Sequence, residues 1–129
     1  MRLIFSILLF LSFLMCGAQY KIASVSFDGT KNTKVSFLKK MSQIKAGMSV
    51  DSVAIETDVN QLKKLPSIAN ATYKLVSAAE STYNLVYTIT ENFTLIPFAN
   101  VYTSSNDEFA YRVGLQEFNL LGRNMIVGA

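Results

Sequence analysis

The spacing of hydrophobic residues changes several times along the chain, and each change marks a predicted element. Apolar and polar residues alternate over residues 20–27, which predicts a half-buried strand. Helical spacing follows twice, over residues 35–41 and 53–65, where apolar positions recur every three or four residues. Alternation returns over residues 71–76 and 83–89. The predicted order is strand, helix, helix, strand, strand, which indicates an α+β domain.

The first predicted helix is short. Thr33 can act as its N-cap, because a hydroxyl at that position can accept a hydrogen bond from an N–H group of the first turn. Val35, Leu38 and Met41 are spaced three residues apart, and we expect all three to face the core. Gly47 follows, and we expect it to interrupt the regular structure before the next helix.

The second predicted helix begins near Ser49 or Asp51, where a side-chain oxygen can cap it and an acidic group favours the positive helix end. Its apolar stripe leaves Asp58 on the polar side. Pro66 ends the helix because proline has no N–H group to donate. The two strands that follow are expected to be joined by a six-residue polar turn at residues 77–82.

The region after Glu91 has no helical spacing. Residues 94–103 have about the ten-residue length that a transmembrane β-strand needs. Residues 104–107 form a cluster typical of turns. Residues 109–116 then alternate strictly, with large apolar side chains on one face and small or polar ones on the other. A barrel strand between lipid and a wet lumen has this pattern, and so does a soluble hairpin that packs on a core.

The amino terminus has the features of an export signal. Arg2 is followed by an apolar run over residues 3–15 and by the small residues Cys16, Gly17 and Ala18, which indicates a secretory signal peptide cleaved after Ala18. At about 1.5 Å per residue the apolar run spans roughly 20 Å, less than the roughly 30 Å hydrocarbon core of a bilayer. The alternative is an uncleaved membrane anchor.

Composition excludes several classes of function. The chain has no His and a single Cys, which excludes a Ser-His-Asp triad and the usual His/Cys zinc site. The nucleophile motif G-x-S-x-G and a Gly-rich phosphate loop are also absent. The net charge of +3 comes from scattered basic residues, a distribution that argues against nucleic-acid binding. We therefore expect a protein that is not an enzyme, with no cofactor, no metal and no nucleic-acid partner.

Three short motifs mark the region up to residue 91. They are Phe27-Asp28-Gly29 at the end of the first strand, the segment 47–51 before the second helix, and Ile89-Thr90-Glu91 at the end of the last strand. Together and in this order they resemble the motifs of POTRA domains, the polypeptide-transport-associated modules of outer-membrane barrel proteins. The resemblance implies a β-α-α-β-β unit in which two helices pack on a three-stranded sheet.

A second resemblance depends on Asn119, Leu120, Leu121 and Gly122. This segment is similar to the turn between the second and third barrel strands of the BamA/TamA-type outer-membrane assembly family, also called bacterial surface antigens. A tight turn needs a residue without the Cβ constraint, here Gly122, and an asparagine that can bond nearby backbone, here Asn119. Because a closed barrel needs at least about eight strands and the sequence stops within the third, the resemblance implies a truncated barrel.

These patterns divide the chain into a signal peptide at 1–18, a POTRA-like domain at 19–92, and the first strands of a truncated outer-membrane β-barrel at 93–129. The resemblance implies an exported protein that takes part in outer-membrane protein assembly or translocation, with its POTRA domain in the periplasm. The partners that it implies are unfolded outer-membrane or secreted polypeptides, outer-membrane lipid and assembly-complex lipoproteins.

POTRA modules bind clients by offering a sheet edge to an extended segment. We expect this edge at Ala71, Tyr73 and Leu75, with Lys74 as a charge that discourages promiscuous pairing. Two other roles fit the same pattern. One is a soluble or membrane-anchored periplasmic scaffold that carries a POTRA module, and the other is the transporter of a two-partner secretion system.

Overall fold

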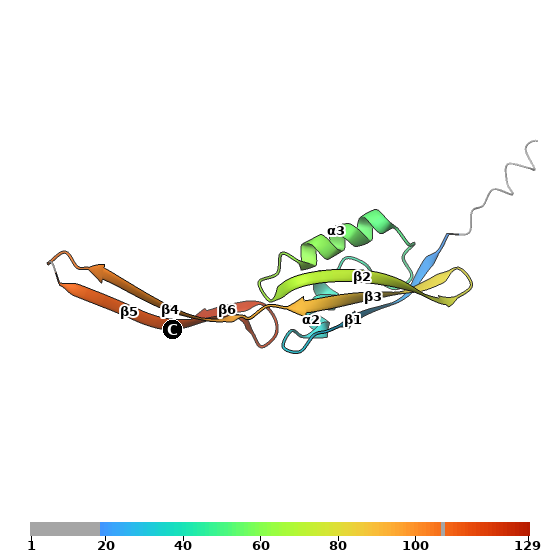
Figure 1. Cartoon of the computed structure of the whole chain (residues 1–129). Coiled ribbons are helices and arrows are strands. Elements are labelled where there is room, and N and C mark those ends of the chain that lie inside the picture. The colour runs from blue at the N-terminus through green and yellow to red at the C-terminus, as the bar shows by residue number, and fades with distance from the viewer. Residues whose placement is uncertain (1–18, 107) are drawn as a thin grey trace, which may run out of the picture.

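The computed structural model describes residues 19–106 and 108–129, so the predicted signal peptide lies outside the described residues. The chain forms two sheets that lie end to end, and the first of them carries both helices (Figure 1). The elements are β1 Lys21–Asp28, α2 Val35–Met41, α3 Ser52–Leu62, β2 Ile68–Ala79, β3 Thr82–Glu91, β4 Leu95–Thr103, β5 Phe109–Leu120 and β6 Met125–Gly128.

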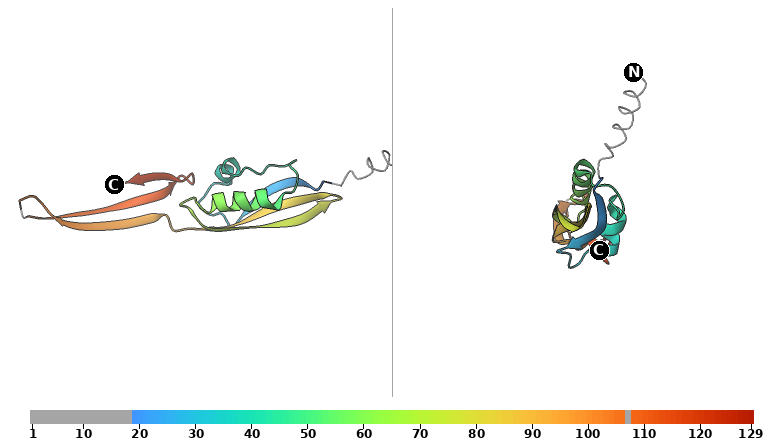
Figure 2. Two further views of the ribbon diagram at one scale, coloured as in Figure 1. Left: turned by 90° about the horizontal axis from the view of Figure 1, so that it is seen from above. Right: turned by 90° about the vertical axis from the view of Figure 1, so that its right-hand side faces the viewer.

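The first sheet has the strand order β1-β3-β2. The central strand β3 runs parallel to β1 and antiparallel to β2. Both helices contribute side chains to a single apolar core with one face of this sheet, and Figure 2 shows the helices beside the three strands. The α+β class, with two helices on a three-stranded sheet, is therefore as predicted.

Half of the buried apolar core residues come from α3 and β3. Alternate residues of β3, Leu85, Tyr87 and Ile89, are all at most 3% exposed and face the helices. Four residues of α3 at positions i, i+3, i+4 and i+7 are buried against them. These four are Ile55, Asp58, Val59 and Leu62.

The prediction for the first helix is only partly correct. Leu38 is fully buried, but Val35 and Met41 are 37% and 43% exposed. A helix of seven residues makes about two turns, so its central residue reaches the core while both end residues remain near solvent. Phe37, half-buried, packs against the core in their place.

The second helix begins as predicted, whereas the turn between β2 and β3 is shorter than predicted. The Asp51 carboxylate caps α3 by accepting from the N–H group of Val53 at 2.9 Å. Strands β2 and β3 continue through most of the predicted six-residue turn and leave only Glu80 and Ser81 between them. Ser81 takes a φ of 59°, which closes the turn without a glycine. The residues at this tip are exposed and extend the ladder, and their composition alone does not distinguish strand from turn.

The second sheet is an antiparallel meander with the order β4-β5-β6. Directly paired residues share a face of such a sheet, so one face carries Val101, Phe109, Tyr111, Val113 and Leu115, which we call the apolar face. The first four of these side chains are each at least 70% exposed. This sheet is separate from the apolar core of the first one, because none of its residues belongs to that core.

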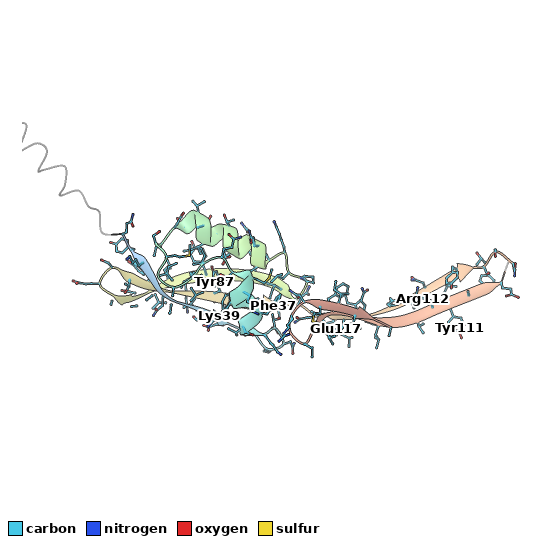
Figure 3. All side chains as sticks on the ribbon, turned by 180° about the vertical axis from the view of Figure 1, so that it is seen from behind. Phe37, Lys39, Tyr87, Tyr111, Arg112 and Glu117 are labelled. Atoms are coloured by element: carbon cyan, nitrogen blue, oxygen red, sulfur yellow. The ribbon has the colours of Figure 1, made fainter. Side chains whose placement is uncertain are left out.

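The opposite face of the second sheet is more polar, although it also carries Ile96 and Tyr102. It carries Asn100, Arg112 and Gln116, and the ring of Phe98 lies directly over Gly114. Figure 3 labels Tyr111 and Arg112, neighbours on β5 that belong to opposite faces. In the part of the chain that the structure describes, no helix has the length and apolar character needed to cross a membrane.

Candidate functional site

Two loops from the two sheets meet where the sheets adjoin, and we call this contact the junction. Residues 31–34, which lead into α2, lie against residues 121–124, which connect β5 to β6. The N–H group of Lys34 donates to the carbonyl oxygen of Gly122 at 3.0 Å. Nearby, the N–H group of Ser67 donates to the side-chain oxygen of Asn124 at 3.1 Å. The second sheet is therefore bonded to two separate segments of the first unit.

Asn119 connects three parts of the junction, and its side chain is 7% exposed. Its Oδ1 accepts from the N–H group of Asn124 at 2.9 Å, which closes the turn. Its Nδ2 donates to the hydroxyl oxygen of Thr33 at 3.0 Å, which joins the turn to the other unit. Its own N–H group donates to Glu117 Oε1 at 2.7 Å. Asn119 thus bonds backbone within its own turn, as expected for this motif, and also reaches the first unit.

The other residues of the turn motif have different environments. Gly122 has a φ of 69° and is buried. A Cβ atom at this position would collide with the carbonyl oxygen of Asn32 and lie 3.0 Å from the backbone nitrogen of Lys34. Leu120 is half-buried, whereas Leu121 is 62% exposed. Only glycine allows the two loops to approach this closely.

Thr33 does not cap α2, contrary to the prediction. The N-cap is Lys34, and its side chain makes no capping hydrogen bond. Thr33 is 3% exposed, and its hydroxyl instead accepts from Asn119. A threonine before a helix carries a local capping signal, but here a partner that lies 86 residues away in the sequence takes the hydroxyl.

Glu91 holds the loop that carries Thr33. Its carboxylate accepts from the N–H group of Asn32 at 2.9 Å and from the N–H group of Thr33 at 2.6 Å. Partial burial acts to raise the pKa of Glu91, but the hydrogen bonds from the backbone N–H groups of this loop outweigh burial and hold that pKa below its ordinary value. The ionised carboxylate is therefore the form that fixes the loop.

Glu91→Gln is expected to lower the free energy of unfolding by about 1–2 kcal/mol at neutral pH, the value for hydrogen bonds to a charged group after discounting for solvent screening. Because the pKa of Glu91 is lower in the folded protein, its contribution is complete above the ordinary pKa near 4.5 and is lost as pH falls through the lowered value. Urea unfolding followed by circular dichroism between pH 7 and pH 3 measures this loss. The exposed Glu80, changed to glutamine, is the control, and an equal effect of both changes would disprove the role of Glu91.

Asp58 lies in the core, although the sequence pattern placed it on the polar side of the second helix. It is 2% exposed and accepts three hydrogen bonds, from the hydroxyl groups of Tyr87 and Ser42, both at 2.6 Å, and from the N–H group of Gln43 at 2.7 Å. Burial raises the pKa of the Tyr87 phenol far above its ordinary value, and the hydrogen bond to the Asp58 carboxylate adds to this rise. Figure 3 labels Tyr87 beside the helices.

This cluster fixes both helices over the sheet. Asp58 belongs to α3, Tyr87 to β3, and Ser42 and Gln43 follow the end of α2. A signal was available in the sequence, because Asp58 is three residues after Ile55 and four before Leu62, within the buried stripe. The prediction gave more weight to the polar character of Asp58 than to its position in the stripe.

The strand order leaves β1 and β2 at the two edges of the first sheet. The start of β1 is covered on its outer side by the loop before α3. There the N–H group of Ile22 donates to Met48 at 2.8 Å, and the N–H group of Gly47 donates to Ile22 at 2.7 Å. Within the described residues, β2 pairs with β3 alone. The outer edge of β2 is therefore the longer free edge of this sheet.

The backbone groups that face outward from β2 can be assigned from the ladder. The carbonyl oxygen of Ile89 points towards Gly29, which follows β1, and therefore away from its partner Ala71 on β2. Ala71 and Ile89 are thus a pair without mutual hydrogen bonds, and alternation places Tyr73 and Leu75 in the same situation. The N–H and C=O groups of these three β2 residues point to the free edge.

The side chains of β2 and its neighbours determine how accessible the backbone groups of this edge are. Ala71 is fully buried, while Tyr73 and Leu75 are half-buried beneath the helices. Lys74 is exposed on the opposite face. The N–H group of Ala71 donates to the side-chain oxygen of Asn70 at 2.9 Å, so one of the outward donors already has a partner. The groups of Tyr73 and Leu75 remain the most accessible part of the edge.

Across residues 19–106 and 108–129, no group of three or more His, Cys, Asp or Glu side chains is close enough to hold a metal ion.

Comparisons with known proteins agree with this architecture. The family model described as POTRA, surface antigen variable number repeat, matches residues 20–92. No curated protein sequence matches the chain. Among solved structures, the crystal structure of BamA from Haemophilus ducreyi lacking POTRA domains 1–3 is similar in fold, with a TM-score of 0.71 and 19% sequence identity. The match covers 84% of this chain and 21% of that one, so the chain spans about a fifth of its length.

Proposed function

Because the chain belongs to the POTRA family of surface antigen variable number repeats, we propose that it takes part in outer-membrane protein assembly or translocation. In this proposal the POTRA domain lies in the periplasm, binds unfolded client polypeptides as an added strand on β2, and passes them to the second sheet in the membrane. The observation that carries the proposal is the free outer edge of β2 at Ala71, Tyr73 and Leu75.

An edge of this kind suits clients of varied sequence. Main-chain hydrogen bonds provide affinity without requiring particular side chains. Lys74 and the Asn70 side chain restrict uncontrolled pairing, the first by its charge and the second by occupying the N–H group of Ala71. Binding is therefore expected to be weak, reversible and tolerant of client sequence.

The second sheet suits a membrane environment. Strands β4 and β5 have 9 and 12 residues, close to the roughly 9–11 residues that a tilted strand needs to span a bilayer. Its apolar face is too exposed for a protein surface in water, whereas Asn100, Arg112 and Gln116 on the other face suit a wet lumen. We infer that the apolar face contacts lipid.

The connection between the two units supports a direct transfer. Strand β3 ends at Glu91 and β4 begins at Leu95, so only three residues separate the sheet that binds the client from the sheet in the membrane. The hydrogen bonds of the junction hold the two sheets in one relative orientation. A client bound along β2 would thus lie at a fixed distance from β4.

Replacing Tyr73 by proline tests this function. The N–H group of Tyr73 faces outward, so proline removes a donor from the free edge without removing a hydrogen bond to β3. As probe we choose a synthetic peptide of residues 109–120, whose apolar and polar residues alternate. We expect its affinity for the full-length protein, measured by calorimetric titration, to fall about three- to tenfold, the value of one or two hydrogen bonds.

Tyr73→Ala is the matched control, because it removes the same ring and keeps the N–H group. In the unmodified protein the amide resonances of Tyr73 and Leu75 should also shift when the peptide binds, a measurement that requires no substitution. Equal affinity of Tyr73→Pro and Tyr73→Ala, or peptide-induced shifts confined to β1, would contradict binding at the β2 edge.

A further inference from the structure

A hollow of about 600 Å³ lies between the two units at the junction, within the size range of small-molecule sites. We call it the junction hollow. Its lining combines basic, acidic and apolar side chains from the loop before α2, from the segment between β3 and β4, and from β5 with its following turn. The residues used below are Lys31, Lys34, Phe93, Leu95, Glu117 and Leu121.

The junction hollow continues the apolar face of the second sheet. Leu95 pairs with Glu117, directly beyond the pair of Pro97 and Leu115, and both pairs lie on the same face. Phe93, which is 75% exposed, extends this surface towards the first unit. A molecule whose apolar part lies along the apolar face would therefore place its polar end in the hollow.

The polar groups of the hollow carry both signs of charge. Lys31 and Lys34, both exposed, lie on the side of the first unit. Glu117 lies on the side of the second sheet, where its Oε1 accepts from the N–H group of Asn119 and its Oε2 has no protein donor among the described residues. Figure 3 labels Glu117 near the end of the second sheet that adjoins the first unit. Two ammonium groups opposite one carboxylate match a ligand that has an anionic and a cationic part.

We propose that the junction hollow binds the phosphoethanolamine headgroup of a glycerophospholipid whose acyl chains lie along the apolar face. Lys31 and Lys34 contact the phosphate, and the Glu117 carboxylate accepts a hydrogen bond from the primary ammonium group. Phe93 and Leu121 contact the glycerol and the first methylene groups. This inference depends on the proposed function, because it requires the apolar face to lie in lipid.

The test uses the full-length protein in liposomes that contain equal amounts of phosphatidylethanolamine, phosphatidylglycerol and phosphatidylcholine. After mild detergent extraction, native mass spectrometry counts the lipids that remain bound to the protein. We expect the unmodified protein to retain phosphatidylethanolamine preferentially. Changing both Lys31 and Lys34 to glutamine should reduce retained phosphatidylethanolamine about tenfold or more, because each lysine near a lipid phosphate contributes about a fivefold factor.

Two further variants identify the source of the effect. Changing both Lys21 and Lys39 to glutamine removes the same charge from residues that do not line the hollow, and we expect less than about a twofold change, because salt screens charges that do not contact the headgroup. Glu117→Gln keeps an acceptor for the N–H group of Asn119 but loses the negative charge. It should therefore reduce the preference for phosphatidylethanolamine over phosphatidylcholine, whose quaternary ammonium group cannot donate.

The outcomes separate this inference from the function on which it depends. If the protein floats with liposomes and the variant at Lys31 and Lys34 retains as much phosphatidylethanolamine as the variant at Lys21 and Lys39, the headgroup site is wrong and the membrane role stands. An unchanged lipid preference in Glu117→Gln also overturns the assignment of ethanolamine. If the unmodified protein does not float with liposomes, the proposed membrane role itself fails.

Discussion

Asp58→Ala is expected to lower the free energy of unfolding by about 3–5 kcal/mol, the largest effect of any single change proposed for this protein. The substitution leaves the buried hydroxyl groups of Tyr87 and Ser42 without their acceptor, and it also removes the acceptor of the partly buried N–H group of Gln43. Each unsatisfied buried donor costs about 1–3 kcal/mol, reduced where a hydroxyl can turn to another acceptor. Urea unfolding followed by circular dichroism measures the loss.

Asp51→Ala is the matched control within the same helix. Asp51 caps α3 from an exposed position, and loss of such a cap typically costs about 1 kcal/mol. Tyr87→Phe should be intermediate, at about 1.5–3 kcal/mol, because the carboxylate loses one of its three donors. Equal losses for Asp58→Ala and Asp51→Ala would mean that the buried cluster does not stabilise the fold.

Gly122→Ala is expected to open the junction at a cost of about 2–5 kcal/mol. Left-handed backbone at an alanine costs about 1–2 kcal/mol, and the added methyl group would collide with the carbonyl oxygen of Asn32. Relief of that collision requires the two loops to separate. The hydrogen bonds of Lys34 to Gly122 and of Asn119 to Thr33 would then be lost, at about 0.5–1.5 kcal/mol each.

Gly47→Ala distinguishes backbone strain from the collision. Gly47 has a φ of 90°, and a Cβ atom there would meet nothing within 4 Å, so only the strain of about 1–2 kcal/mol is expected. Hydrogen exchange gives a local readout, because the amides of Lys34 and Ser67 donate across the junction. Loss of their protection in Gly122→Ala and its retention in Gly47→Ala would establish the close approach. Protection retained in both would disprove it.

The features that the sequence predicted well are those that depend on near neighbours. Alternation identified the strands because the side-chain period of a strand is two residues. Asp51 was identified as a helix start because capping involves the next two or three residues. The positive φ of Gly122 likewise depends on the backbone freedom of a single residue.

The features that it did not predict depend on partners distant in the sequence. Thr33 has the local signature of a cap, but its hydroxyl accepts from Asn119. Asp58 has the polarity of a surface residue, yet Tyr87 and Ser42 supply donors that make its burial possible. A pattern along one segment cannot specify which donors another segment brings to it, so the junction and the buried cluster became evident only with the fold.

The short link between the two sheets has a mechanical consequence. A polypeptide added to β2 and pulled along its length would load the β2–β3 ladder in shear, where many hydrogen bonds share the force. Beyond Glu91 the same tension would run through the three-residue connection 92–94, where the N–H group of Asn92 donates to Ser67 and the carbonyl oxygen of Thr94 accepts from Phe118, beside the contacts of the junction. Pulling on a captured chain would therefore strain the connection 92–94 before it strains either ladder, and would transmit the load to β4.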